Sequence, residues 1–105
     1  MITMTQEQIS LWNSTSMALV QAMLGAVSPN FRQVNLCRED DEWILSFFLE
    51  SDSEEDREEI EHITVQFEAF HDRPVDMKIE ITVGSEELSF PEGPGRAVYR
   101  RREYS

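Results

Sequence analysis

Residues 75–83 read Val-Asp-Met-Lys-Ile-Glu-Ile-Thr-Val and carry the strongest structural signal in the chain. Apolar residues occupy every odd position from Val75 to Val83, and the residues between them are charged or polar. Such alternation predicts a β-strand with one buried face and one face in water. Gly84 interrupts the pattern, so we predict a strand over residues 75–83.

A helix is predicted before this strand, over residues 53–71. Apolar residues recur there at helical spacing and form one stripe, namely Ile60, Ile63, Phe67 and Phe70. Ser51 or Ser53 can cap the start of the helix, and Arg73-Pro74 closes its end. Because residues 50–61 contain eight acids and one arginine, the face opposite the stripe carries a dense negative charge.

Two further strands, over residues 31–38 and 43–49, form a predicted β-hairpin with a polar turn between them. The second strand is apolar on both faces, because Ile44 and Phe48 alternate with the apolar residues at positions 43, 45, 47 and 49. It is therefore either a central strand covered on both sides or a strand that exposes an apolar patch.

The first helix is predicted over residues 6–26. Thr5 and Gln8 match a capping box, and Ser28-Pro29-Asn30 ends the helix because the residue before proline is disfavoured in the α conformation. At the other end of the chain, residues 96–105 hold four of the nine basic residues and can add a short strand over 97–101.

The predicted order is α-β-β-α-β with a possible short C-terminal strand. We predict an α+β two-layer sandwich with both helices on one face of a small mixed sheet, since a helix between two strands favours a parallel crossover. We expect a single α+β domain over residues 1–95. Residues 96–105 form a basic tail of charge +3, which belongs to the same domain if it folds back on a body of charge −15.

The charge of the chain narrows the class of partner. The sequence has 21 acidic and nine basic residues, a net charge of −12. Such a field repels phosphate backbones and anionic lipid surfaces, so we expect no nucleic acid and no membrane as partner and favour a cationic protein. The most apolar stretch, residues 17–27, is too short to span a bilayer and lacks a preceding basic region. We expect a cytoplasmic protein.

Enzyme motifs are absent from the sequence: there is no P-loop, dinucleotide fingerprint, nucleophile elbow or HExxH. Cys37 has His62 and His71 as formal partners, but a lone strand cysteine is more often a small buried residue. Glu58 and His62 share a helix face, and a transition-metal site requires more nitrogen ligands than this pair provides. We predict no catalytic residue, no metal site and no cofactor.

The acidic residues are the candidate partner-binding residues. Their excess exceeds what solubility requires, and carboxylates beside an aromatic ring suit the recognition of a basic protein. A solvated helix face is the simpler alternative, and Trp43 can equally belong to the core. The predicted partner-binding residues are Asp40, Asp41, Glu42, Trp43, Glu54, Glu55, Glu58 and Glu59.

Three stretches carry a family resemblance: Ser28-Pro29-Asn30-Phe31-Arg32, Glu54-Glu55-Asp56-Arg57-Glu58-Glu59-Ile60-Glu61 and Pro94-Gly95-Arg96-Ala97-Val98-Tyr99-Arg100-Arg101-Arg102-Glu103. They resemble small bacterial immunity proteins, which are encoded with toxins of contact-dependent growth inhibition and related polymorphic toxin systems. The resemblance implies a cytoplasmic, non-catalytic protein that binds one cognate toxin domain, often a nuclease, and blocks it. A non-catalytic adaptor, a homodimeric subunit joined through Ile44 and Phe48, and a small enzyme remain as alternatives.

Overall fold

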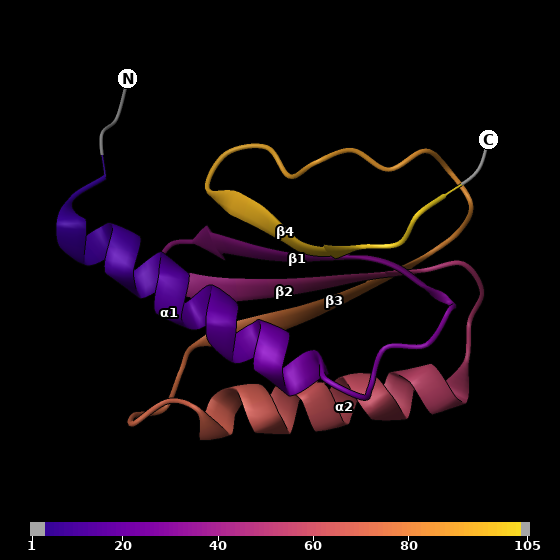
Figure 1. The fold of residues 1–105 in the computed structure, drawn as a ribbon, viewed down its shortest axis with the longest axis horizontal. Coiled ribbons are helices and arrows are strands. Elements are labelled where there is room, and N and C mark those ends of the chain that lie inside the picture. The colour runs from indigo at the N-terminus through magenta and orange to yellow at the C-terminus, as the bar shows by residue number, and fades with distance from the viewer. Residues whose placement is uncertain (1–3, 104–105) are drawn as a thin grey trace.

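A computed structural model describes residues 4–103 (Figure 1). The elements are, in order, α1 (Gln6–Met23), β1 (Phe31–Glu39), β2 (Glu42–Leu49), α2 (Glu54–Ala69), β3 (Met77–Val83) and β4 (Gly95–Arg100). The strands form one mixed sheet in the order β3-β2-β1-β4. Strand β1 is antiparallel to β2 and β4, whereas β2 and β3 are parallel. The predicted α+β order and the short C-terminal strand are confirmed.

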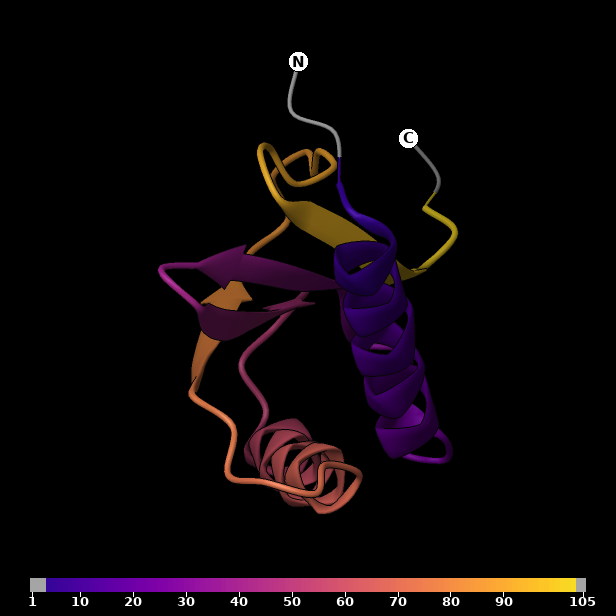
Figure 2. The same cartoon turned by 90° about the vertical axis from the view of Figure 1, so that its left-hand side faces the viewer.

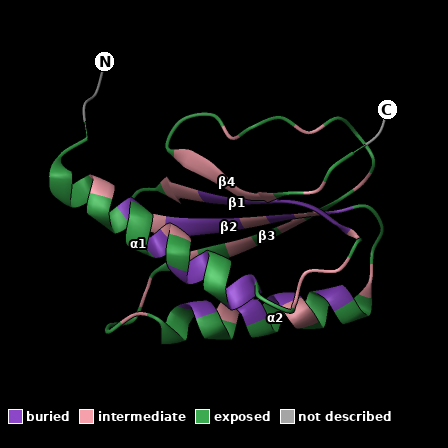
Figure 3. Cartoon of the chain, viewed as in Figure 1, coloured by how far each residue is buried: buried purple, intermediate pink, exposed green. Residues whose placement is uncertain are grey.

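Both helices pack on one face of the sheet, as predicted. Helix α1 lies on the side of β1 and β4, and α2 lies below β2 and β3 (Figure 2). Figure 3 shows that both helices and the strands β1 and β2 contain buried residues. The most deeply buried apolar residues are Leu19, Phe31, Val34, Leu36, Leu45, Phe47, Leu49, Ile60, Ile63 and Phe67.

The helix ends follow local capping chemistry. The Thr5 hydroxyl accepts a hydrogen bond from the Gln8 N–H at 3.1 Å, and Gln8 Oε1 accepts one from the Thr5 N–H at 2.8 Å, which confirms the capping box. Helix α1 ends at Met23 rather than residue 26, because Gly25 follows with φ +79°, in the left-handed region that terminates helices. Ser53, one of the two predicted caps, caps α2.

Strand β2 is a central strand of the sheet, the first of the two alternatives that its two apolar faces had left open. One face packs against the helices. On the other face the Ile44 side chain is buried and Phe48 is half-buried. The pair therefore offers little exposed apolar area for a homodimer contact.

Residues 84–94 connect β3 to β4 and cover part of the sheet face that carries no helix. The Gln33 amide donates to the Ser89 carbonyl at 3.0 Å, and Arg100 Nη2 donates to the Leu88 carbonyl at 2.9 Å. Gly95 is needed where this segment enters β4, because an added Cβ would stand 2.9 Å from both Cys37 Sγ and Pro91 Cβ.

Candidate functional site

The predicted acidic residues lie in two groups. We call Glu54, Glu55, Glu58 and Glu59 the α2 acidic surface, and Asp40, Asp41 and Glu42 the hairpin acidic surface. Strand β2 begins at the hairpin and ends shortly before α2, so the two groups lie at opposite ends of the sheet (Figure 1). An eight-residue strand spans about 25 Å. The structure therefore does not join them into one continuous surface.

The α2 acidic surface is available for contact. Glu54, Glu55 and Glu58 are exposed and make no ion pair with any residue in the range 4–103, while Glu59 lies 3.7 Å from His62 Nδ1. These carboxylates occupy the first turns of α2, where the helix dipole favours negative charge. Their charges point into solvent from a rigid element.

One acid of the same run serves the fold instead. The Asp56 side chain is buried, and its Oδ2 accepts a hydrogen bond from Asn30 Nδ2 at 2.8 Å. The Asn30 amide also accepts from the Ser51 N–H at 2.9 Å and donates to the Ser51 carbonyl at 2.8 Å. Asn30 thereby fixes the start of α2 against the start of β1.

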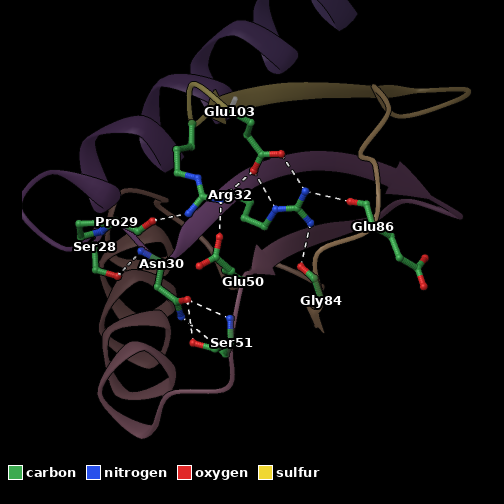
Figure 4. Close-up of polar contacts among 10 residues, drawn as sticks. Ser28, Pro29, Asn30, Arg32, Glu50, Ser51, Gly84, Glu86 and Glu103 are labelled. Atoms are coloured by element: carbon green, nitrogen blue, oxygen red, sulfur yellow. Dashed lines mark hydrogen bonds and ion pairs between the residues drawn. The ribbon is translucent and has the colours of Figure 1, made fainter. Parts of the chain in front are cut away.

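A buried arginine forms the second polar network (Figure 4). Arg32 is 5% exposed, and its Nε and Nη2 donate to the two carboxylate oxygens of Glu103 at 2.7 and 2.8 Å. The same guanidinium donates to the carbonyls of Gly84 and Glu86, both at 2.8 Å. Arg101 completes the network by donating to Glu103 at 3.0 Å. The basic tail is thus tied to the body of the protein.

The Arg32 network and the Asn30 contacts together join the three stretches of sequence that carry the family resemblance. Arg32 belongs to the first stretch and Glu103 to the third, and Asn30 links the first to Asp56 in the second. Arg101 Nη1 also donates to the Pro29 carbonyl at 2.7 Å. The sequence did not indicate this role for Arg32, because its partners Glu103, Gly84 and Glu86 lie 71, 52 and 54 positions away along the chain.

The network predicts a pH dependence of stability. The hydrogen bonds from Arg32, and then the one from Arg101, lower the pKa of Glu103 from 4.5 to about 2. A carboxyl whose pKa is lowered by folding stabilises the native state above its ordinary pKa and loses that contribution as the pH falls toward the lowered value. We expect the wild type to lose more stability than Glu103→Gln between pH 4.5 and about 2. Urea titrations across this window test it, and parallel curves for the two proteins would contradict it.

The remaining arginines are largely engaged within the protein. Arg57 Nε lies 2.6 Å from Asp52 Oδ1, and Arg101 Nη2 lies 2.9 Å from Glu50 Oε1. Arg38 stacks on the Trp43 ring and Arg96 on the Trp12 ring, at 4.3 and 5.3 Å from the ring centroids. These arginines therefore contact residues outside the α2 acidic surface and do not neutralise its negative charge.

The hairpin acidic surface stands on a tight turn. Asp40 and Asp41 have φ of 51° and 64°, the left-handed region that a two-residue hairpin turn requires. Both side chains are exposed, and Asp41 Oδ1 lies 3.7 Å from Arg38 Nη2. A shallow hollow of about 330 Å³ adjoins the turn, lined by Glu39, Asp40, Glu42, Ile44, Asp76 and Lys78. The sequence-based set of binding residues did not include Glu39 or Asp76. Asp76 is far from the hairpin in sequence, and the pairing of β3 with β2 brings it to this hollow.

Trp43 belongs to the core, one of the two places that the sequence left open for it. Its side chain is 4% exposed, and its ring meets Trp12 edge to face with centroids 5.0 Å apart. The ring is therefore not displayed beside the hairpin carboxylates as an exposed anchor.

A groove between α2 and β3 escaped the sequence reasoning. It has a volume of about 630 Å³ and is lined by Arg57, Ile60, Glu61, Thr64, Val65, Ile79 and Ile81. Val65 is 62% exposed and lies off the apolar stripe of α2. An apolar residue on the polar side of the helix was the feature of the sequence that could have indicated this groove. The groove runs along the helix that carries the α2 acidic surface.

The nucleophile candidate lies apart from the histidines. Cys37 alternates with the core residue Leu36 and so points to the face of the sheet opposite the helices, whereas His62 lies on α2 and His71 just after it. Burial, and then the charge of Glu80, raises the pKa of the Cys37 thiol. Within residues 4–103 no three His, Cys, Asp or Glu side chains are grouped in a way that could hold a metal ion.

Neither helix of the described part is both long and apolar enough to cross a membrane.

Comparison with known proteins identifies the family. A family model described as MafI2 immunity protein matches residues 13–103, a range that includes every strand, α2 and both acidic surfaces. A comparison with curated proteins gave no match. The match spans most of the chain and agrees with the resemblance noted from its sequence, so the chain belongs to the MafI2 immunity protein family.

Proposed function

We propose that this protein neutralises one cognate toxin domain by binding a cationic surface of that domain through the α2 acidic surface. The family supports a role in toxin immunity. The basic character of the toxin, its activity as a nuclease, a cytoplasmic site of action and a purely non-catalytic mode of protection are our proposals beyond that role.

The observation that carries the proposal is the row of unpaired carboxylates on α2. Glu54, Glu55 and Glu58 are exposed on a rigid helix of a chain with net charge −12. A nuclease is cationic where it holds phosphates, so an acidic inhibitor is attracted to that same surface. Complementary charge accelerates the encounter and orients the two proteins.

The α2 acidic surface fits this role better than the hairpin acidic surface. Near the hairpin, Arg38 Nη2 approaches Asp41 Oδ1, a carboxylate of the surface itself, to 3.7 Å, while Lys78 Nζ lies 3.7 Å from Glu80 Oε2. On α2, Arg57 lies 2.6 Å from Asp52, which is outside the α2 acidic surface. The local field is therefore less compensated on α2.

The test compares two sets of neutralised variants. One replaces all four glutamates of the α2 acidic surface by glutamine, and the other carries Asp40→Asn, Asp41→Asn and Glu42→Gln. Asparagine tolerates the positive φ of the turn, and exposed charges contribute little to stability, so both variants are expected to fold.

The protein encoded immediately upstream of this gene serves as the candidate toxin in the test. At low ionic strength we expect the α2 variant to associate with it about tenfold more slowly than the wild type. The difference should shrink toward 0.15 M salt, where the screening length is about 8 Å. We expect a smaller change for the hairpin variant. Stopped-flow association and protection of toxin-expressing cells provide the measurements. A wild-type association rate for the α2 variant would contradict the steering role of the α2 acidic surface. If only the hairpin variant associates slowly, the hairpin acidic surface is the one that attracts the toxin.

A further inference from the structure

We propose that an extended basic segment of the toxin binds in the α2–β3 groove and pairs with β3 as a fifth strand of the sheet. This inference rests on the proposed function and specifies which surface makes the contact.

The outer edge of β3 is free to pair. Strand β3 stands at the end of the sheet, and no other strand within residues 4–103 joins it on that side. The Trp43 N–H donates to the Asp76 carbonyl at 2.9 Å, and the Gly84 N–H donates to the Leu49 carbonyl at 2.9 Å. Because backbone groups alternate along a strand, the even residues of β3 face β2. The N–H and C=O groups of residues 77, 79 and 81 therefore face outward.

The opposite edge of the sheet, formed by β4, is protected against pairing with another strand. Strand β4 is short, its register shifts opposite Val34 and Asn35, and the 84–94 segment is attached to it through Arg100. Such devices prevent unwanted pairing at an edge. Strand β3 is one residue longer and has no register shift: it pairs with β2 in continuous register over seven residues and contains no proline. Its charged residues, Lys78 and Glu80, alternate with Ile79 and Ile81 and so lie on the sheet face away from the groove. A regular open edge is a template for an added strand.

The groove beside this edge selects the kind of segment. Ile79 and Ile81 form its wall on β3, and the exposed Val65 faces the same space from α2. An added strand would turn alternate side chains toward these apolar residues. Apolar side chains on one face of the incoming segment would fill the 630 Å³ groove.

The charge of the rim selects a basic partner. Glu61 lines the groove, and Glu58 and Glu54 precede it by three and seven residues on the same helix face. Arg57 also lines the groove, but its charge is paired with Asp52 at 2.6 Å. Basic residues of the incoming segment would thus meet the α2 acidic surface. A second copy of this chain is a poorer occupant, because each copy carries a net charge of −12 and the like-charged rims would repel one another.

Amide hydrogen exchange tests the strand pairing directly. In the free protein we expect the outward amides of Ile79 and Ile81 to exchange quickly and those of Lys78 and Glu80, which face β2, to be protected. Binding of the upstream-encoded candidate toxin should slow exchange at Ile79 and Ile81 by about tenfold or more. Residues 78 and 80 serve as the internal control. Unchanged exchange at both outward amides in a saturated complex would overturn the proposal.

Substitution tests the groove. Val65→Arg changes a residue that is 62% exposed, and Met17→Arg makes the same change at a residue on α1 that is 55% exposed. We expect Val65→Arg to raise the Kd of the toxin complex by about 30-fold, as for an interface hot spot, and Met17→Arg to leave it near the wild-type value. Equal Kd values for the wild type and Val65→Arg would overturn the groove assignment.

The outcomes separate this inference from the proposed function. If the wild type neither binds the toxin nor protects cells from it, the proposed function itself fails. If the wild type binds and protects but the Ile79 and Ile81 amides and the Val65→Arg variant show no effect, only the groove inference fails. Sedimentation of the free chain gives the remaining outcome: a dimer that Val65→Arg dissolves would assign the groove to a second copy and overturn the toxin assignment.

Discussion

Phe67→Ala is expected to lower the free energy of unfolding by about 3–5 kcal/mol, the range for removing a core aromatic residue. The Phe67 side chain is fully buried in the core between α2 and the sheet. Its ring also contacts the His71 ring, with centroids 4.8 Å apart. The truncation would leave a cavity at the C-terminal end of α2, because the surrounding core can collapse only partly.

Phe70→Ala is the matched control for this substitution. Phe70 follows the end of α2 and is 50% exposed, so its truncation removes little buried surface. We expect it to cost less than about 1 kcal/mol. Urea denaturation of both variants measures the difference. Similar losses for the two phenylalanines would show that Phe67 is not packed in the core as described. Phe70, the last residue of the predicted apolar stripe, lies beyond the end of α2 and outside that core.

Arg32→Met is expected to destabilise the protein by about 3 kcal/mol, the lower end of the range for breaking a buried ion pair. Methionine retains much of the apolar stem but removes the donors to Glu103, Gly84 and Glu86. The carbonyls of Gly84 and Glu86 then lose this donor, while the Glu103 carboxylate retains the hydrogen bond from Arg101. The loss stays at the lower end because the Glu103 side chain is partly exposed and water can reach it.

Arg57→Met provides the comparison for an exposed pair. Arg57 Nε lies 2.6 Å from Asp52 Oδ1, as close as the Arg32 pair, but both of its side chains are exposed. Surface pairs contribute about 0–1 kcal/mol, so we expect a small effect. Urea denaturation of the two variants shows whether the loss of stability depends on the burial of the ion pair, because the N–O distances of the two pairs are nearly the same. An Arg32→Met protein as stable as Arg57→Met would contradict the structural role of the network.

The elements of this fold were predictable because their signals are local. Alternation over residues 75–83 and the stripe from Ile60 to Phe67 place β3 and α2 from neighbouring residues alone. Helix ends were less certain, since the end of α1 depends on the backbone conformation of Gly25. The exposure of the α2 carboxylates was also predictable, because burial of an unpaired charge is costly.

The candidate site was only partly predictable. Sequence reasoning found the acidic residues but could not show that the α2 and hairpin groups lie at opposite ends of the sheet, because that separation follows from the course of β2. It also left Trp43 undecided. The partner that buries its ring, Trp12, lies 31 positions earlier in the chain.

The sequence by itself determined the element order, the apolar faces and the negative charge, because each depends on the spacing or number of residues along the chain. Tertiary structure alone decided which strands became edges, which acids stayed unpaired and how Arg32 met Glu103. These features depend on contacts between residues far apart in sequence, including 71 positions for the Arg32–Glu103 pair. The open edge of β3 and its groove belong to this second group, because a strand becomes an edge only through the placement of all the others.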